Sequence, residues 1–184
     1  MLISGNKNKG LAQSLYTLYP TATFCSRATG YELTDTTDME RFAKLSTQNE
    51  VIIVNSALWR FHQSVLLDLV YKACVSAQHK AHIVVIGSTT DRVCNGKAWL
   101  YNAEKKALRD YSNTLAIGGV WGDHAPKVSY ISFGTLSNNQ HKHPDRKCLD
   151  IDAAACYIKW IIDQPRHLNI NEISVDPMQD NSWY

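Results

Sequence analysis

Short apolar runs alternate with longer amphipathic segments along this chain. Two of the runs, residues 51–54 and 83–86, are apolar and β-branched at every position, which is typical of strands buried on both faces. The same pattern predicts shorter strands over 1–4, 23–26, 31–34, 128–133 and 172–175, and helices over 11–19, 38–45, 59–78, 97–116 and 152–163. Such an alternation indicates an α/β fold with a doubly wound, mainly parallel, Rossmann-like sheet and helices on both faces.

The segment 31–34 is the strand that this arrangement accommodates least well. Only Arg27 to Gly30 separate it from the strand before it, whereas parallel neighbours need a crossover of about a dozen residues. We therefore expect a short extended segment or a poorly paired edge strand there. Asp38 is expected to cap the helix that continues to Leu45.

Composition places the chain among folded proteins with one domain. Its 184 residues are 45% hydrophobic and 20% charged, a balance that excludes disorder. We expect a single domain over residues 1–177, followed by a C-terminal tail over 178–184.

Charge and cysteine content narrow the classes of function. The formal net charge is only +2, which argues against a nucleic-acid partner and against polybasic membrane binding. No apolar run approaches the ~20 residues of a membrane-spanning helix, and the segment before Gly5 is too short for the core of a signal peptide. The five cysteines form no CxxC pair, so we expect reduced thiols in a cytoplasmic protein.

A loop that carries two glycines joins the first predicted strand to the first predicted helix. Gly5 follows the strand and Gly10 opens the helix, so the backbone can turn tightly and approach an anion at the helix N-terminus. Lys7 and Lys9 add positive charge to this loop. A dinucleotide phosphate site is one interpretation of the pattern, and an ordinary strand-to-helix turn is the other.

Arg27 bears on the choice between NADP and NAD. It follows the second predicted strand, where the ribose of a dinucleotide lies in folds of this kind. No Asp or Glu occupies positions 24–30, and an Arg there accommodates a 2′-phosphate, whereas an acidic residue would bind the 2′-hydroxyl. Arg27 therefore favours NADP over NAD, unless it is simply a solvated surface side chain.

Ser88, Tyr101 and Lys105 are the candidate catalytic residues. Ser88 emerges at the carboxyl end of a buried strand, where ligands of open α/β sheets bind. Tyr101 and Lys105 are four residues apart on one predicted helix face. A nearby ammonium would lower the Tyr101 pKa and suit it to proton exchange with an alcohol or carbonyl. The alternative for this pair is a surface lysine beside a half-buried tyrosine.

Taken together, these residues resemble those of the short-chain dehydrogenase/reductase family, from residue 1 to about residue 177. Ser88 precedes Tyr101 by 13 positions, which is similar to the family's usual spacing, and Lys9 with Arg27 resembles its NADP-preferring members. Other segments also resemble family motifs: Val54-Asn55-Ser56-Ala57 the Asn-Asn-Ala-Gly segment, Asp35-Thr36 the acidic segment that contacts adenine, Ser132-Phe133-Gly134-Thr135 the Pro-Gly segment beneath the nicotinamide, and 168–173 the entry to the last strand.

The resemblance implies an NADP-dependent oxidoreductase that acts on a small carbonyl compound or secondary alcohol. Tyr101 would be the acid/base, Lys105 would lower the Tyr101 pKa and hold the nicotinamide ribose, and Ser88 would orient the carbonyl. The implied cofactor-binding residues are Gly5, Lys9, Gly10, Leu11, Arg27, Asp35, Thr36, Asn55, Ser56, Ala57, Tyr101, Lys105, Gly134 and Thr135. In the family, two helices form a two-fold interface, which implies a homodimer or homotetramer through the helices over 59–78 and 97–116.

Several departures from the family pattern keep other interpretations open. Four residues, not three, separate Gly5 from Gly10, Ala12 replaces the third glycine, and the family's catalytic helix Asn has no clear match among His62, Gln63 and Ser64. The chain is also shorter than most members in the segments that shape the substrate pocket. A second interpretation is therefore a non-catalytic NADP-binding sensor or assembly subunit. A nucleotide-sugar epimerase or reductase is a third, opposed by the lack of a larger C-terminal substrate domain.

The polar segment 137–147 is expected to be a mobile loop that partly covers the pocket. His141, His143, Asp145 and Cys148 cluster in or next to it. Their spacing matches no closed zinc pattern, so we expect no metal site.

Overall fold

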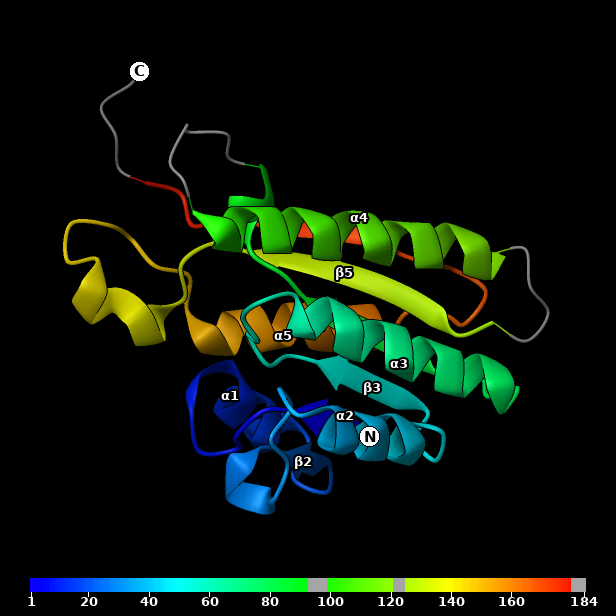
Figure 1. Ribbon diagram of the computed structural model, residues 1–184. Helices are drawn as coiled ribbons and strands as arrows, with labels where there is room; N and C mark the ends of the chain where they lie inside the picture. The colour runs from blue at the N-terminus through cyan, green and yellow to red at the C-terminus, as the bar shows by residue number, and fades with distance from the viewer. Residues whose placement is uncertain (93–98, 121–124, 180–184) are drawn as a thin grey trace.

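A six-stranded parallel sheet forms the centre of the molecule (Figure 1), in the computed structural model that describes residues 1–92, 99–120 and 125–179. The strands are β1 (Leu2–Ser4), β2 (Thr23–Cys25), β3 (Val51–Val54), β4 (His82–Ile86), β5 (Lys127–Phe133) and β6 (Glu172–Val175). Their order across the sheet is β2-β1-β3-β4-β5-β6, and every neighbouring pair is parallel. The predicted doubly wound, parallel fold class is confirmed.

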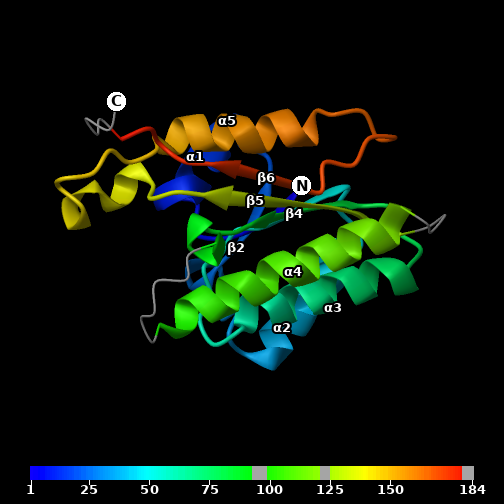
Figure 2. The same ribbon diagram turned by 90° about the horizontal axis from the view of Figure 1, so that it is seen from above.

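Helices cover both faces of the sheet, as Figure 2 shows edge-on. One face carries α1 (Gly10–Leu18) and α5 (Ile151–Ile162), and the other carries α2 (Thr36–Ser46), α3 (His62–Ser76) and α4 (Leu100–Val120). Three short 3₁₀ helices lie in the connections: η1 (Arg27–Thr29), η2 (Thr89–Arg92) and η3 (Ser137–Lys142). The helix predicted over 97–116 continues four residues further, to Val120. Its predicted first residues, 97 and 98, lie outside the described part of the chain, as do residues 180–184 of the predicted tail and Cys94.

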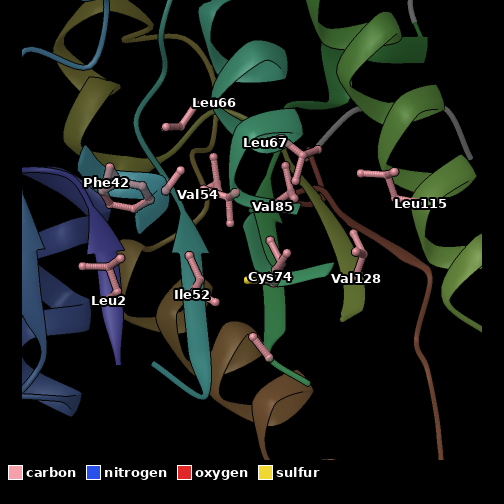
Figure 3. Close-up of a cluster of buried hydrophobic side chains, with 14 of the residues drawn as sticks. Leu2, Phe42, Ile52, Val54, Leu66, Leu67, Cys74, Val85, Leu115 and Val128 are labelled. Atoms are coloured by element: carbon pink, nitrogen blue, oxygen red, sulfur yellow. The ribbon is translucent and has the colours of Figure 1, made fainter. Parts of the chain in front are cut away.

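Two apolar clusters, one on each face, explain why the strands are apolar at every position. Successive side chains of a strand point to opposite faces, so Ile52 packs under α2 and α3 while Ile53 packs under α1 and α5. Figure 3 shows the first cluster, in which Val54 and Val85 point toward Leu66 and Leu67 of α3. All of these side chains are fully buried, and their burial from water is the main stabilising contribution to this layered arrangement.

Residues 31–34 join the sheet neither as a full strand nor as a poorly paired edge strand, because their backbone groups are committed elsewhere. After η1, Gly30 turns the chain with φ of 79°, and the Tyr31 N–H donates to the Ser26 carbonyl at 2.9 Å. The Glu32 N–H donates to the Asp38 carboxylate at 2.7 Å. The chain then enters α2 directly, so β2 remains the edge of the sheet.

The cap of α2 lies three residues earlier than predicted. Asp35, not Asp38, is the N-cap residue, and its carboxylate accepts hydrogen bonds from Thr37 N at 2.9 Å and Asp38 N at 3.2 Å. Asp38 instead holds the Glu32 N–H and pairs with Arg41. Both aspartates suit the first turn of a helix, and the sequence pattern did not discriminate between them.

In the described ranges, no helix combines the length and the apolar character needed to cross a membrane. The cysteines within those ranges, Cys25, Cys74, Cys148 and Cys156, are free thiols. Cys25 and Cys74 are buried in the apolar cluster under α2 and α3, where they pack as small hydrophobic side chains.

Candidate active site

The carboxyl ends of the parallel strands meet at one edge of the sheet and bring the predicted site residues there. Gly5 follows β1, Asn55 follows β3 and Gly134 follows β5, while Ser88 comes two residues after the end of β4. β1 lies between β2 and β3, so the winding of the chain reverses at β1. Ligands of open α/β sheets bind outside the carboxyl ends at such a reversal.

Gly5 occupies a position that no other residue can take without displacing its neighbours. Its φ is +148°, and a Cβ there would lie 2.8 Å from Asn55 Nδ2 and 3.1 Å from the Ala12 methyl. The backbone of the first loop therefore lies against both the β3 end and α1. Gly10, with φ of +53°, begins α1 and faces Asn138 of η3.

A cavity of about 700 Å³ opens beside this loop. Six predicted cofactor residues line it: Gly5, Lys9, Arg27, Asn55, Ser56 and Ala57. Its wall also contains Tyr31, Glu32, Leu33, Trp59 and Arg60, among others. Its volume suits a nucleotide-sized ligand. Lys7 is not part of the wall, since its ammonium lies 5.0 Å from the centre of the Tyr16 ring.

Ser4 holds one side of this cavity in place, and the sequence reasoning missed it. Its hydroxyl is fully buried and accepts hydrogen bonds from Asn55 N at 2.9 Å and Ser56 N at 3.0 Å. A serine at the end of an otherwise apolar strand was the available sign, because a buried hydroxyl needs a partner.

Arg27 shares the cavity with an acidic residue that the sequence argument had placed elsewhere. Its guanidinium Nε lies 3.7 Å from Glu32 Oε2, and both side chains are well exposed, at 84% and 45%. The absence of Asp and Glu from positions 24–30 therefore does not leave the cavity free of carboxylates. Such an exposed pair contributes little to stability.

Asp35 and Thr36, predicted to contact adenine, do not line the cavity. Asp35 caps α2, and Glu32, Leu33 and Thr34 lie in the wall in their place. Gly10 and Leu11 are also absent from the lining of this cavity, and Leu11 points from α1 into the apolar cluster between this helix and the sheet. The displacement follows from the missing strand, because the chain enters α2 three residues earlier than the pattern suggested.

Ser88, Tyr101 and Lys105, the candidate catalytic residues, lie close together. A hydrogen bond joins the Ser88 and Tyr101 side chains, and the Lys105 ammonium lies 5.3 Å from the centre of the Tyr101 ring. Tyr101 is flanked by two tryptophans, Trp59 and Trp99, each with its ring centre at 5.1 Å. The three candidate residues thus occupy one centre at the sheet edge.

The pKa of Tyr101 differs in direction from the expectation. Burial raises it above its ordinary value of 10.0, the Ser88 hydrogen bond lowers it, and the Glu104 carboxylate raises it further. Lys105 is almost completely buried, and this burial lowers the pKa of Lys105 to about 8 against the opposing charges of Glu104 and Asp91. Tyr101 is therefore protonated at neutral pH and available as a proton donor.

Gln63 of α3, one of the three residues His62, Gln63 and Ser64 left open by the sequence, contacts Lys105. Lys105 Nζ donates to Gln63 Oε1 at 2.6 Å. The Gln63 amide nitrogen donates to the carbonyls of Val54 at 3.2 Å and Ile86 at 2.8 Å. This buried side chain links the ammonium to the ends of β3 and β4, so its orientation is fixed by the sheet.

Comparison with known proteins identifies the fold of this chain. No family model matches the chain, and no curated protein matches it. Solved structures do: serine dehydrogenase in complex with NADP+ has a TM-score of 0.72 at 13% identity and covers 95% of this chain and 94% of its own. Serine dehydrogenase from Escherichia coli has a TM-score of 0.72 at 14% identity, with 95% of each chain covered. A short chain dehydrogenase from Burkholderia cenocepacia J2315 in complex with NADP has a TM-score of 0.74 at 12% identity, covering 94% and 86%.

The chain has the short-chain dehydrogenase/reductase fold. The family named from the residues is thus the one whose solved structures share this architecture over nearly the whole chain. The likeness concerns the fold, so the roles of individual residues rest on the contacts within this chain.

Behind the candidate site of this short-chain dehydrogenase/reductase fold lies a buried polar network that the sequence reasoning did not include. The Asp91 carboxylate, in η2, accepts hydrogen bonds from the Tyr130 hydroxyl at 2.9 Å and from Ser132 Oγ at 2.8 Å. The Ser88 backbone N–H donates to the Tyr130 hydroxyl. A Cβ at Gly87 would lie 1.9 Å from that hydroxyl, so Gly87 gives Tyr130 its space. The network thereby fixes the backbone of Ser88.

A second cavity, of about 610 Å³, opens beside Thr89 and Thr90 of η2. Its lining includes threonines and charged residues of both signs: Thr89, Thr90, Thr135, Asp145, Arg146, Lys147, Asp176, Pro177 and Gln179. Thr135, a predicted cofactor residue, belongs to this wall. Gly134 lies against Asp176 and Pro177, where a Cβ would come within 2.4 Å of Asp176 Oδ1.

The loop over 137–147 contains the helix η3 and internal hydrogen bonds. Gln140 donates to the carbonyls of His143 at 2.7 Å and Arg146 at 2.8 Å, and Gln179 pairs with the Lys147 backbone through two contacts of 3.0 Å. Among the residues that the structure describes, no three His, Cys, Asp or Glu side chains gather to hold a metal ion.

Proposed function

We propose that this protein is an NADP-dependent oxidoreductase in which Tyr101 exchanges the proton of a substrate carbonyl or alcohol. The observation that carries the proposal is the meeting of Ser88, Tyr101 and Lys105 at the carboxyl edge of the sheet. Trp59, whose ring lies against that of Tyr101, belongs to the wall of the cavity of about 700 Å³. A phenol, a hydroxyl and an ammonium in one partly buried centre suit proton transfer to an oxygen atom.

The residues of the first cavity fit a dinucleotide. Gly5 leaves the space that a Cβ would fill against Asn55, so the backbone of the loop can approach a phosphate. Lys9 and Arg27 add positive charge to the wall, and the N-terminus of α1 favours anions. When bound there, a nicotinamide dinucleotide would supply or accept the hydride.

The side chains of the centre have distinct roles in this proposal. The Tyr101 hydroxyl gives its proton to the carbonyl oxygen as negative charge develops there, and Ser88 donates a hydrogen bond to the same oxygen. Lys105 stabilises the phenolate that remains, because an ammonium favours a nearby anion. Gln63 holds the Lys105 ammonium at 2.6 Å, and the Asp91–Tyr130 network holds the Ser88 backbone.

We infer that the second cavity receives the substrate and favours a polar compound. The cavity of about 610 Å³ is bounded by Thr89, Thr90 and Thr135 together with charged side chains. Such a lining offers hydrogen bonds and leaves polar groups unpaired when an apolar ligand enters. We therefore expect small hydroxylated or charged carbonyl compounds to be better substrates than long-chain aldehydes.

The variant Tyr101→Phe tests the proposal. It removes the proton donor but keeps the ring between Trp59 and Trp99, so NADPH should still bind while turnover falls by ~10²–10⁴-fold. The assay is a screen of carbonyl compounds with NADPH oxidation as the readout, and NADPH binding is measured by calorimetry. Tyr71→Phe is the matched control, because Tyr71 is another half-buried tyrosine on the neighbouring helix α3. Near wild-type turnover by Tyr101→Phe would remove Tyr101 from the mechanism.

The raised pKa of Tyr101 favours a second candidate, a NADP-binding sensor or assembly subunit without turnover. A phenol whose pKa lies above its ordinary value is a weaker acid than a tuned catalytic tyrosine. This candidate predicts that NADPH binds with a thermal shift, that no carbonyl compound is reduced, and that Tyr101→Phe leaves binding unchanged. Reduction of any compound by the wild type decides for the enzyme.

A further inference from the structure

Glu104 is a buried carboxylate that the proposed reaction does not use. It lies on α4, between Tyr101 and Lys105 in the chain, and is 4% exposed. One of its oxygens, Oε1, accepts a hydrogen bond from Arg60 N at 2.7 Å. Among the residues that the structure describes, nothing donates a hydrogen bond to Oε2. Burying an incompletely paired carboxylate is costly, so its position calls for a reason.

The turn that Glu104 holds has a strained backbone. Arg60 has φ of 57° and Phe61 has φ of 62°, and neither is a glycine. Residues with a side chain adopt this left-handed region at a cost, and they do so in succession only where the surroundings impose it. The hydrogen bond from Arg60 N to the buried carboxylate is such a constraint.

This turn places the ring of Trp59 against Tyr101, the candidate proton donor. Trp59, which precedes the strained pair, lies with its ring centre 5.1 Å from that of Tyr101. Trp59 and Arg60 also line the cavity of about 700 Å³. The Glu104 carboxylate thus connects the helix that carries Tyr101 to the loop that forms the cavity wall.

The charge of Glu104 acts on Lys105 as well. Burial lowers the pKa of Lys105 to about 8, and Glu104 is the larger of the two charges that oppose this effect, the other being Asp91. The groups that face the ammonium are Tyr101 and Glu104 from α4, the uncharged Gln63 from α3, and Asp91 from η2. Asp91 is itself held by the Tyr130 hydroxyl and lies 3.5 Å from Arg92 Nε.

We propose that Glu104 is a positioning residue of the reactive centre, whose buried carboxylate holds the Trp59–Phe61 turn against Tyr101 and supplies a negative charge beside Lys105. Its role in turnover rests on the proposed function, whereas its effects on the turn and on Lys105 are properties of the folded chain. The hydrogen bond that Glu104 accepts from Arg60 N and its charge beside Lys105 can be separated by substitution, because glutamine keeps the acceptor oxygen and loses the charge.

The first test compares Glu104→Gln with the wild type by NMR titration of ¹³C-labelled lysine side chains. The Lys105 resonance is identified by its loss in Lys105→Met. The amide oxygen of Gln still accepts from Arg60 N, but the charge beside Lys105 is gone, so the pKa of Lys105 should fall by about one unit or more. Glu40→Gln is the matched control, because Glu40 is an exposed residue of α2 with the same charge change. An unchanged Lys105 titration in Glu104→Gln would overturn the electrostatic part.

The second test uses Glu104→Asp and Glu104→Ala. Aspartate retains the charge but retracts the carboxylate, so the Lys105 titration should stay near that of the wild type while the turn loosens. Alanine loses both. Loosening is read from tryptophan emission, as the difference between each variant and the same variant carrying Trp59→Phe; a shift to longer wavelength is expected. Unchanged Trp59 emission in both variants would overturn the positioning part, whether or not Glu104→Gln folds.

Neither readout requires turnover, so failure of the proposed function and failure of this inference are distinguishable. If the protein is an enzyme, a third consequence follows. Reduction that requires the Lys105 ammonium declines as pH rises through the pKa of Lys105, so the alkaline limb of the pH–rate profile should move to lower pH in Glu104→Gln. A limb that stays in place while the NMR titration moves would show that Lys105 charge does not limit turnover, and it would overturn the role of Glu104 in the reaction.

Discussion

Replacing Tyr130 by phenylalanine should lower the free energy of unfolding more than the same substitution at a more exposed tyrosine. Tyr130 is fully buried on β5, and its hydroxyl donates to the Asp91 carboxylate at 2.9 Å. The variant removes a hydrogen bond to a charged group, which contributes about 1.5–3 kcal/mol. It also leaves the Ser88 N–H without its acceptor and Asp91 with Ser132 as its remaining hydrogen-bond donor in the described network.

The chain offers a matched comparison. Tyr111 of α4 donates to the Asp68 carboxylate at 2.6 Å, but this pair is half-buried and Asp68 also binds Lys72 at 2.8 Å. Solvent can replace the lost partner there, so Tyr111→Phe should cost about 1 kcal/mol or less. The two variants delete the same atom from the same kind of pair and differ in burial.

The measurement is urea denaturation followed by circular dichroism, with thermal unfolding alongside. For a chain of this length, 1 kcal/mol corresponds to about 2–4 °C, so Tyr130→Phe should lower the midpoint by about 3–12 °C. It should also reduce turnover, because the Ser88 backbone loses a contact. A loss of unfolding free energy no larger than that of Tyr111→Phe would refute the reasoning, since burial would then not set the energy of this network.

Three further outcomes are expected. Arg27→Asp should weaken NADPH binding by about tenfold or more and leave NADH binding little changed, whereas Glu32→Gln should strengthen NADPH binding, because the Glu32 carboxylate would repel a 2′-phosphate. Calorimetry with both cofactors measures these affinities. Equal weakening of NADPH and NADH binding by Arg27→Asp would show that Arg27 has only a structural role. Light scattering at micromolar concentration should give a homodimer or homotetramer joined through α3 and α4, which expose apolar side chains such as Val65 and Ile117, and a monomer would contradict it. Burial lowers the pKa of Lys105 from 10.5 to about 8, so between pH 8 and 10.5 the folded state holds fewer protons than the unfolded state. The free energy of unfolding should therefore increase with pH across this range. Denaturation of Lys105→Met at successive pH values should lack this increase.

Much of this fold could be predicted from the sequence because its strands are buried on both faces. The runs 51–54 and 83–86 are β-branched and apolar throughout, and no other element explains such runs flanked by helical spacing. Element boundaries were less accurate, as at α2. Asp35 and Asp38 both satisfy the pattern of a helix start, and the choice depends on the Glu32 N–H, which reaches Asp38 only after Gly30 has turned the chain.

The candidate site divides in the same way. Ser88, Tyr101 and Lys105 could be chosen as candidates from the sequence because a strand end and a helical i, i+4 spacing are local features. The structure shows that the three side chains lie close together. Gln63, Asp91 and Glu104 were missed or left undecided because their partners are distant in sequence: Gln63 contacts Lys105, Asp91 contacts Tyr130, and Glu104 contacts Arg60. Polar residues of this kind look like surface residues until the fold shows that they are buried.

The distribution of buried charge gives an argument for function that does not depend on likeness of fold. Among the described residues, the buried acidic and basic side chains are Asp91, Glu104 and Lys105, and all three belong to the neighbourhood of Tyr101. Each would be more favourably placed in water, because burial of a charge opposes folding unless its partners compensate for the lost hydration. A protein that needed this sheet only as a scaffold could place apolar side chains at these positions and gain stability. The chain instead concentrates these buried charges around the phenol of Tyr101 and the hydroxyl of Ser88, and burial lowers the pKa of Lys105 there. A buried group with such a shifted pKa is typical of a site that acts on a ligand.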